Sequence, residues 1–321
     1  MRQLTLRALA EEAPTEVYDL FCGGGGFSAG ARAAGARIAF ACDNDAAALR
    51  WHRANHPETE HLLAELPAEL PFPKDGRAFH VHGSPPCTRY SSCCTLVLTE
   101  EQKRQRASLV EWYLETALTC GASTWSMEQV HTGNIVQLVE AAAKRHPGRV
   151  AYGVFHFEEL GVPQKRKRLI AGSPHLVARL SRAREEQPRV SVRQALPELR
   201  GPFIRNSKYW VKSRKRMNRR AGQSIYVQAK AKLTDNCYHV DGPCPTLLAG
   251  RAFCWVTPTD PPTHAWLTTA EYARIQTFPA AYCWPESGTA ALRLIGNSVP
   301  PLVAELLMRR AGSHSAWAGA A

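Results

Sequence analysis

The chain has 321 residues, with 40 Lys and Arg against 28 Asp and Glu, so its formal net charge is +12. At roughly 150 residues per domain, this length suggests one large domain or two unequal ones. No apolar stretch approaches the roughly 20 residues that span a bilayer, and residues 1–14 lack the apolar run of a signal peptide. These features argue against a membrane protein and against an exported one, and they predict a cytoplasmic protein.

The ten cysteines include no Cys-x-x-Cys pair and no Cys/His series at zinc-ligand spacing. We therefore expect neither a metal nor a disulfide framework. The excess positive charge lies in one segment, because residues 176–240 hold 16 Lys and Arg against 4 Asp and Glu. Its densest part, residues 205–220, has eight basic residues, no acid, and Tyr209 and Trp210 among them. This stretch favours nucleic-acid binding, with a solvated basic loop or a localisation tract as the alternatives.

From residue 17 onward, strand-like and helix-like runs alternate. The expected strands are residues 17–21, 37–42, 78–81, 124–127 and 150–157, and the expected helices are residues 27–34, 45–55, 99–120, 135–144, 268–277 and 300–310. Such alternation predicts an α/β fold with a mostly parallel sheet and crossover helices on both faces. The pattern breaks near Ser173, and residues 173–243 are basic and poor in apolar periodicity, which suggests a separate loop-rich module.

A glycine-rich turn follows the first expected strand. Residues 19–26 read Asp-Leu-Phe-Cys-Gly-Gly-Gly-Gly and lead into a helix, so the backbone can approach a ligand closely. About 20 residues later the second strand ends near Asp43, where an acid accepts ribose hydroxyls in nucleotide-type sites. The glycine spacing of residues 24–29 also satisfies a loose dinucleotide fingerprint, so a nicotinamide enzyme stays open, as does a plain tight turn.

Cys87 stands behind two prolines, just after the expected strand at residues 78–81. Proline fixes the backbone, and the carboxyl end of a strand is where open α/β sheets bind their ligands. The position can therefore display a nucleophile, while a small buried thiol is the structural alternative.

Three further elements place polar side chains next to expected strands or helices. Glu128 follows a strand, and Arg166 and Arg168 alternate before apolar residues, so these two cations should face the same side. Gly296 and Asn297 form an expected turn into the last helix. Taken singly, each element has an ordinary explanation: a solvated strand end, an edge-strand charge pattern or a simple turn.

Together, in this order and spacing, the elements resemble the DNA (cytosine-5) methyltransferase family. The resemblance covers nearly the whole chain, from the glycine turn through Pro-Cys, Glu-x-Val, Gln-x-Arg-x-Arg and the basic segment to Gly-Asn-Ser-Val. It implies a Rossmann-like AdoMet-dependent methyltransferase sheet with a small, loop-rich DNA target-recognition domain. The expected catalytic domain is residues 1–186, completed by about 290–321. The small domain is residues 187–289, with its basic recognition segment at about 200–243.

The resemblance implies transfer of a methyl group from S-adenosyl-L-methionine to C5 of a flipped cytosine in a short duplex DNA site, through a covalent adduct between Cys87 and C6. By match to the family's motifs, the catalytic residues are Cys87, Glu128, Arg166 and Arg168. The cofactor-binding residues are Asp19, Phe21, Gly23, Gly25, Gly26, Asp43, Pro85, Asn297, Ser298 and Val299. The expected DNA contacts are Ser91, Gln164, Arg205, Lys208, Lys212, Arg214, Lys215, Arg216, Arg219 and Arg220.

The chain departs from the family's pattern at three places. The usual Glu-Asn-Val has Gln129 in the middle, the glutamine after the nucleophile is Thr88, and Glu65 is the nearest candidate for the acid that contacts the adenine amine. The alternatives are an RNA (tRNA) cytosine-5 methyltransferase and a catalytically silent DNA-binding regulator. The Cys-Phe-Thr tripeptide typical of tRNA-methylating relatives is missing, and silent relatives usually lose the nucleophile or the glutamate.

The resemblance also implies the partner and the setting. The expected partner is double-stranded DNA, bound by a monomer with no membrane and no metal. The expected location is the cytoplasm, in association with the nucleoid in a bacterium, or the host nucleus or cytoplasm for a viral enzyme. The enzyme would serve restriction-modification or act as an orphan methylase.

Overall fold

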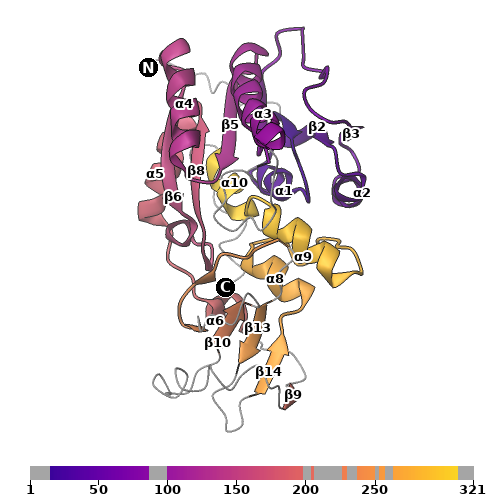
Figure 1. The fold of residues 1–321 in the computed structure, drawn as a ribbon, viewed down its shortest axis with the longest axis vertical. Helices are drawn as coiled ribbons and strands as arrows, with labels where there is room; N and C mark the ends of the chain where they lie inside the picture. Colours follow the sequence, from indigo (N-terminus) through magenta and orange to yellow (C-terminus); the bar gives the residue numbers. More distant parts are fainter. Residues whose placement is uncertain are drawn as a thin grey trace, which may run out of the picture.

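The computed structural model of the protein describes residues 15–86, 100–197, 204–205, 226–229, 237–249, 253–256 and 263–309 (Figure 1). Its strands are β1 (Glu16–Leu20), β2 (Arg37–Asp43), β3 (Glu60–Leu63), β4 (Phe79–Gly83), β5 (Thr124–Gln129), β6 (Ala151–His156), β7 (Gln164–Lys165), β8 (Lys167–Gly172), β9 (Ile204–Arg205), β10 (Tyr226–Ala229), β11 (Cys237–His239), β12 (Cys244–Pro245), β13 (Phe253–Val256) and β14 (Thr263–Trp266). Its helices are α1 (Gly26–Ala33), α2 (Ala46–Asn55), α3 (Glu100–Thr119), α4 (Gly133–Arg145), η1 (Phe157–Leu160), α5 (Pro174–Glu186), α6 (Val192–Ala195), α8 (Thr269–Ile275), α9 (Gly288–Asn297) and α10 (Pro301–Met308).

The large sheet has seven strands in the order β3-β2-β1-β4-β5-β8-β6. All neighbouring strands from β3 to β5 pair in parallel, whereas β8 runs antiparallel to both β5 and β6. The mostly parallel sheet expected from the alternating pattern is confirmed. Because the chain leaves β1 first toward β2 and β3 and later toward β4 and β5, the order reverses between β1 and β4. Open α/β sheets bind their ligands at the carboxyl ends of strands beside such a switch point.

Successive side chains of the strands supply two separate cores. On β1, Val17 packs with helices α1, α5 and α10, while Tyr18 and Leu20 pack with α3 and α4 on the opposite face. The same alternation separates Ile170 from Leu169 on β8. Figure 1 shows the result as three layers, with helices on both faces of the sheet. The crossover helices expected on both faces are therefore present.

Helix α5 was not expected from the sequence. Its buried side chains are Leu176, Val177, Leu180 and Ala183, which face the core shared with α1 and α10. They recur at helical spacing, but the basic residues between them mask the apolar stripe. The expectation that regular structure breaks near Ser173 is therefore wrong, since this helix continues it to Glu186.

Two smaller expectations also need correction. Gly296 and Asn297 are the last two residues of helix α9 and not a turn, and the chain turns only at residues 298–300. Glu128 lies inside strand β5 and not beyond it. A hydrophobic stripe of Ala291, Leu294 and Ile295 defines α9, and a glycine at each end conceals it.

A second sheet and a third core make up the lower part of Figure 1. Five strands pair antiparallel in the order β11-β10-β13-β14-β9. The third core brings together Val240, Leu247, Phe253, Tyr272 and Ile295. Helix α8 closes this core, and a capping box begins the helix, because Thr268 and Glu271 satisfy each other's backbone N–H groups. Since α9 contributes Ile295 here and α10 packs on α1, residues 288–308 join the two sheets.

Candidate active site

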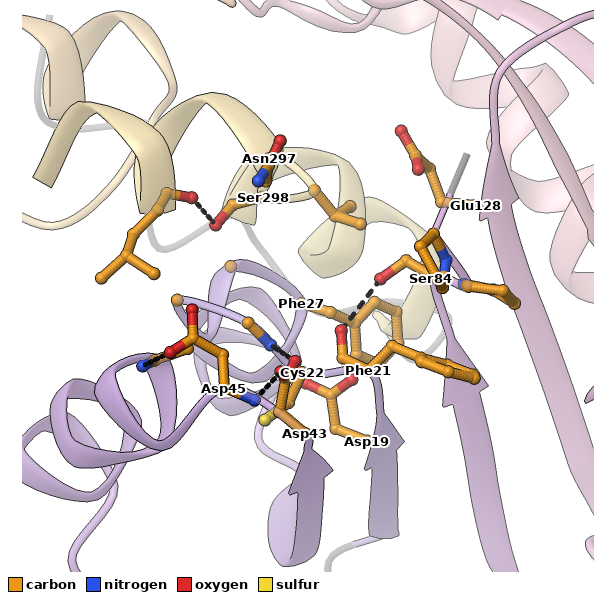
Figure 2. A pocket seen from close by; sticks show the side chains of 18 of the residues that line it. Asp19, Phe21, Cys22, Phe27, Asp43, Asp45, Ser84, Glu128, Asn297 and Ser298 are labelled. Atoms are coloured by element: carbon orange, nitrogen blue, oxygen red, sulfur yellow. Dashed lines mark hydrogen bonds between the residues drawn. The ribbon is translucent and has the colours of Figure 1, made fainter. Parts of the chain in front are cut away.

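A cavity of about 340 Å³ lies at the carboxyl ends of β1, β2, β4 and β5 (Figure 2). Its wall comes from the turns after these strands and from residues 293–299, so widely separated segments meet here. The predicted site residues that line it are Asp19, Phe21, Gly23, Gly26, Asp43, Pro85, Glu128, Arg166, Arg168, Asn297, Ser298 and Val299. The volume is within the range of small-molecule sites, roughly 300 to 1,000 Å³.

The glycine turn after β1 has an unusual backbone. Phe21 has a φ of 58°, and Gly23 and Gly25 have φ values of 52° and 79°. A non-glycine residue in this left-handed region costs on the order of 1–3 kcal/mol and typically marks a functional site. The Gly23 N–H donates to Asp43 Oδ2 at 2.8 Å, and a Cβ on Gly23 would meet no atom within 4 Å. Gly23 therefore leaves its side of the cavity open.

Gly25 and Gly26 have a packing role. A Cβ on Gly25 would collide with the Tyr282 hydroxyl, and one on Gly26 would collide with the Val299 carbonyl oxygen and lie 2.8 Å from the Ser298 Cβ. Gly26 still lines the cavity, but Gly25 does not. The first glycine turn and the loop after α9 therefore touch through their backbones, and any side chain at Gly26 would separate the two walls.

Asp19 is buried at the base of the cavity, where Figure 2 shows it beside Phe21 and Asp43. The Ser28 hydroxyl donates to its Oδ2 at 2.6 Å, while its buried Oδ1 has no hydrogen-bond partner within the described part of the chain. Burial raises the pKa of Asp19 to about 7, and the hydrogen bond from Ser28 opposes that rise. Burial also raises the pKa of Asp43, against hydrogen bonds from the backbone of Asp45 and Gly23. This end of the cavity therefore presents carboxyl oxygens that a cationic ligand would satisfy.

The opposite end of the cavity holds Glu128, Arg166 and Arg168. Arg168 Nε lies 2.9 Å from Glu128 Oε1, and Arg166 Nη2 lies 4.0 Å from the same oxygen. The expectation that the two arginines face one side is confirmed. Arg166 is almost fully buried and also donates to the Gly296 carbonyl at 3.0 Å, which ties the residue between β7 and β8 to the end of α9.

The loop after β4 is anchored to both ends of the cavity. Its Pro85 carbonyl accepts from Gln129 Nε2 at 3.0 Å, and the Ser84 hydroxyl donates to the Phe21 carbonyl at 3.4 Å. Gln129, which replaces the family's asparagine, therefore holds this loop. Pro86 lines the cavity, and Cys87 is the next residue in the chain but lies outside the described residues.

The expected DNA contacts fall mostly on segments that the structure does not describe. Arg205 belongs to strand β9, and the residues outside the described ranges are Ser91, Lys208, Lys212, Arg214, Lys215, Arg216, Arg219 and Arg220. Gln164 is fully buried. It donates to Gln276 Oε1 at 2.6 Å and accepts from the Leu247 N–H at 2.8 Å. This burial contradicts the expected DNA contact, and Gln164 instead ties β7 to the second core.

Several residues of the site were missed by sequence reasoning. Asp45 begins α2 by accepting from the Ala47 and Ala48 N–H groups, and it also forms an ion pair with Arg293 across the mouth of the cavity. An acid just before a helix is a recognisable capping signal, whereas nothing in the sequence marks Arg293. Glu65, the suggested adenine contact, is exposed and lines the cavity.

No helix in the described ranges is long and apolar enough to cross a membrane. No group of three or more His, Cys, Asp and Glu side chains among those residues is arranged to hold a metal ion.

Comparison with known proteins extends these observations. The chain matches the model of the C-5 cytosine-specific DNA methylase family over residues 15–117 and 147–313. It is 26% identical to the Type II methyltransferase M.HgiDI of Herpetosiphon aurantiacus over 302 residues, which cover 89% of this chain and 90% of that protein.

Solved structures share the fold. One is a candidate DNA modification methyltransferase from an E. coli prophage, with a TM-score of 0.64 and 20% identity, covering 92% of this chain and 97% of that one. Another is a mutant of Spodoptera frugiperda DNMT2, with a TM-score of 0.64 and 17% identity, covering 92% of this chain and all of that one. Since the family model spans most of the chain, the protein belongs to the C-5 cytosine-specific DNA methylase family.

Proposed function

We propose that this protein is a DNA (cytosine-5) methyltransferase that acts on a cytosine flipped out of a short duplex site, through a covalent adduct between Cys87 and C6. The observation that carries the proposal is the shared cavity. Its wall includes the glycine turn, the Glu128 carboxylate with two guanidinium groups, and the proline that directly precedes Cys87. A methyl donor and a pyrimidine would therefore meet within one enclosed site.

The glycine-turn end fits S-adenosyl-L-methionine, which supplies an electrophilic methyl group on its sulfonium. The unpartnered Asp19 Oδ1 suits the ammonium of its amino-acid part, and Asp43 suits the ribose hydroxyls. Glu65 at the edge suits the adenine amine. The remaining cofactor contacts that we propose are Phe21, Gly23, Gly26, Pro85, Asn297, Ser298 and Val299. Gly25 would act only by shaping the turn.

Glu128 would recognise the cytosine. In its protonated form the carboxyl group can donate to N3, while its other oxygen accepts from the exocyclic amine, and Arg168 lies 2.9 Å from Oε1. Addition of a thiolate to C6 pushes electron density onto N3, so a proton or a hydrogen bond given to N3 promotes the attack on C6. The buried Arg166 lies 4.0 Å from the same oxygen of this carboxylate.

Cys87 would supply the nucleophile. Only the thiolate adds to C6, and a free cysteine with a pKa near 8.5 is mostly protonated at neutral pH, so nearby cations help. Arg166 and Arg168 provide positive charge in the cavity that Pro86 also lines. After methylation the C5 proton leaves to a base, and elimination of the thiolate restores the aromatic ring.

The basic segment at residues 200–243 would bind the duplex and read its sequence. Lys and Arg neutralise phosphates, and extrusion of a base costs a few kcal/mol that protein contacts must offset. We propose that residues 1–186 and about 290–321 form the catalytic domain, and that residues 187–289 form the recognition domain. The similarity to a Type II methyltransferase suggests a restriction-modification role.

Bisulfite sequencing tests the proposed reaction. An unmethylated plasmid is incubated with purified protein and S-adenosyl-L-methionine, and Cys87→Ser runs in parallel. The matched control is Cys283→Ser, at an exposed thiol away from the cavity wall. We expect protected cytosines in one short context with the wild type and the control, and none with Cys87→Ser. Activity of Cys87→Ser would overturn the mechanism.

A radiolabelled methyl donor with DNA and with tRNA as acceptors separates the substrate classes. We expect label in duplex DNA only. Label in tRNA alone would establish the RNA enzyme instead, and DNA binding without transfer to either acceptor would favour the silent regulator.

A further inference from the structure

Four side chains form a hydrogen-bonded chain from the base of the cavity toward the surface. Ser28 Oγ lies 2.6 Å from Asp19 Oδ2, and His52 Nε2 lies 3.1 Å from Ser28 Oγ. His52 Nδ1 in turn lies 2.8 Å from His61 Nε2. Asp19, Ser28 and His52 are buried, whereas His61 is partly exposed and also hydrogen-bonds the Thr59 backbone. Of these four side chains, only His61 is exposed to water.

The chain admits two arrangements of its protons, because a hydroxyl and a neutral imidazole each carry one N–H or O–H. When Asp19 is ionised, Ser28 donates to it, His52 donates to Ser28 through Nε2, and His61 donates to His52 through Nε2. When Asp19 is protonated, every donor reverses: Asp19 donates to Ser28, Ser28 to His52 Nε2, and His52 Nδ1 to His61. The second His61 nitrogen, Nδ1, then carries the proton. The two arrangements differ by one proton in total.

Both histidines suit such a chain because they are neutral near pH 7. Burial lowers the pKa of His52 well below its ordinary value, and the neighbouring His56, His61 and Arg53 lower it further. Burial, followed by Arg53, also lowers the pKa of His61.

The other titratable groups that face Asp19 come from the elements around it. They are Cys22 from the turn after β1, Asp43 at the end of β2, Tyr113 from α3, Tyr282 beyond α8, and His82, the register partner of Asp19 on β4. Burial raises the pKa of Cys22, Tyr113 and Tyr282 and lowers that of His82, so these four are neutral near pH 7. Asp43 is an acid that opposes ionisation of Asp19.

We propose that Ser28, His52 and His61 are positioning residues that carry one proton from Asp19 to solvent when a cation enters the cavity. The proposal rests on the proposed function, since the expected cation is the ammonium of S-adenosyl-L-methionine. The transfer balances: Asp19 gives its proton to Ser28, Ser28 to His52 Nε2, His52 Nδ1 to His61 Nε2, and His61 Nδ1 to water. Each relay member regains the proton that it loses, and Asp19 alone becomes charged.

Nitrogen NMR of the full chain with labelled histidine tests the relay directly, because the ring nitrogens report which one carries the proton. His52→Gln and His61→Gln spectra assign the two rings. As the free protein is titrated from pH 5.5 to 8.5, we expect His52 to change from the Nδ1–H to the Nε2–H form, and His61 to change in the same way, with one shared midpoint near pH 7. Unchanged tautomers across this range would overturn the relay.

Calorimetry measures the proton that leaves. Binding of S-adenosyl-L-homocysteine, which has the same ammonium, is measured in buffers of different ionisation enthalpy. We expect close to one proton to be released per bound ligand at pH 6 and close to none at pH 8. We also expect Kd to be roughly tenfold weaker at pH 6 than at pH 8, as linkage to a group of pKa about 7 requires. Binding without proton release at pH 6 would overturn the relay.

Ser28→Ala separates a relay from a merely structural role. The substitution removes the hydrogen bond from Ser28 that favours ionised Asp19, so we expect the pH midpoint of Kd to move to higher pH. It also removes the hydroxyl between Asp19 and His52, so we expect the His52 and His61 tautomers to stop changing with pH. The matched control is His146→Gln, at the end of α4 and not a member of the hydrogen-bonded series. It should change neither the Kd midpoint nor the tautomers of His52 and His61. Tautomers that still switch in Ser28→Ala would overturn the relay. If the histidine tautomers of the wild type change with pH but the protein binds neither S-adenosyl-L-methionine nor S-adenosyl-L-homocysteine, the relay would stand and the proposed cofactor would be wrong.

Discussion

The two ends of the cavity hold carboxylates in opposite ways. Asp19 lies at the glycine-turn end with one oxygen unpartnered and, among the described residues, no Lys or Arg paired with it. At the other end, Glu128 Oε1 also makes no hydrogen bond among the described residues, but Arg168 and Arg166 lie within ion-pair distance of it. The protein's own arginines therefore compensate the charge of Glu128, whereas only a ligand would compensate the charge of Asp19. The glycine-turn end should therefore respond to pH and to ligand occupancy, whereas the charges at the Glu128 end are already paired before a ligand binds.

The largest expected effect separates chemistry from cofactor binding. Glu128→Gln keeps the size of the side chain but removes its charge, so Arg166 and Arg168 lose their shared partner. We expect the turnover rate to fall by roughly 10²- to 10⁴-fold, as for loss of a group that takes part in proton transfer. Methyl-transfer kinetics measure this loss, and calorimetry should give a Kd for S-adenosyl-L-homocysteine within about twofold of wild type. If affinity for S-adenosyl-L-homocysteine fell by as large a factor as the turnover rate, the two ends of the cavity would not have separate roles.

Asp19→Asn should improve stability and harm binding. A buried carboxyl whose pKa rises to about 7 binds a proton more tightly when folded than when unfolded, so wild-type stability falls as pH rises from about 4 to about 7. At pH 8 we expect the ligand-free variant to be more stable than wild type by up to about 4 kcal/mol, and the difference should vanish near pH 4.

Urea unfolding at several pH values measures the stability of Asp19→Asn. We expect Kd for S-adenosyl-L-homocysteine to be about 10- to 100-fold weaker, the worth of a hydrogen bond to a charged group. If the variant were less stable than wild type at pH 8, the carboxylate would have a partner that this geometry does not provide.

Gly26→Ala tests the contact between the glycine turn and the loop after α9. The new Cβ meets the Val299 backbone, which cannot swing aside as a flexible side chain would. We expect a stability loss of about 1–3 kcal/mol or more, typical of overpacking. Gly133→Ala is the matched control, because a Cβ at the start of α4 meets no atom within 4 Å, and it should be neutral or slightly stabilising. Equal unfolding midpoints for the two variants would contradict the close contact.

Arg293→Gln should have the smallest effect. Its ion pair with Asp45 is substantially exposed on both sides, so it contributes under about 1 kcal/mol. We expect a Kd for S-adenosyl-L-homocysteine within about fivefold of wild type, and the difference should shrink in high salt. A larger or salt-independent change would mean that Arg293 contacts the ligand directly.

The large sheet was predictable because its strands are apolar and regularly interrupted by helices. The short strands of the second sheet were not, since two to four residues among polar neighbours carry little periodic signal. Helix α5 escaped for a related reason, because long basic side chains flank its apolar stripe.

Sequence reasoning located most of the cavity because motifs mark the turns after strands. Gln164 shows its limit, since the sequence cannot tell a polar residue that binds DNA from one that satisfies buried groups. The chain from Asp19 to His61 shows the same limit. Its members lie on four different elements or turns, and only the folded sheet and helices bring them within hydrogen-bond distance.

The contact between the first and last described helices, α1 and α10, has a consequence for how the protein is made. Gly30 lies directly against the Pro301 backbone, and the ribosome adds that partner about 270 residues later. At bacterial to eukaryotic translation speeds, the glycine turn waits roughly 10 to 60 seconds for its opposite wall. A nascent or prematurely terminated chain that ends before residue 298 lacks that wall. The cavity is therefore complete only after residue 299 has been synthesised.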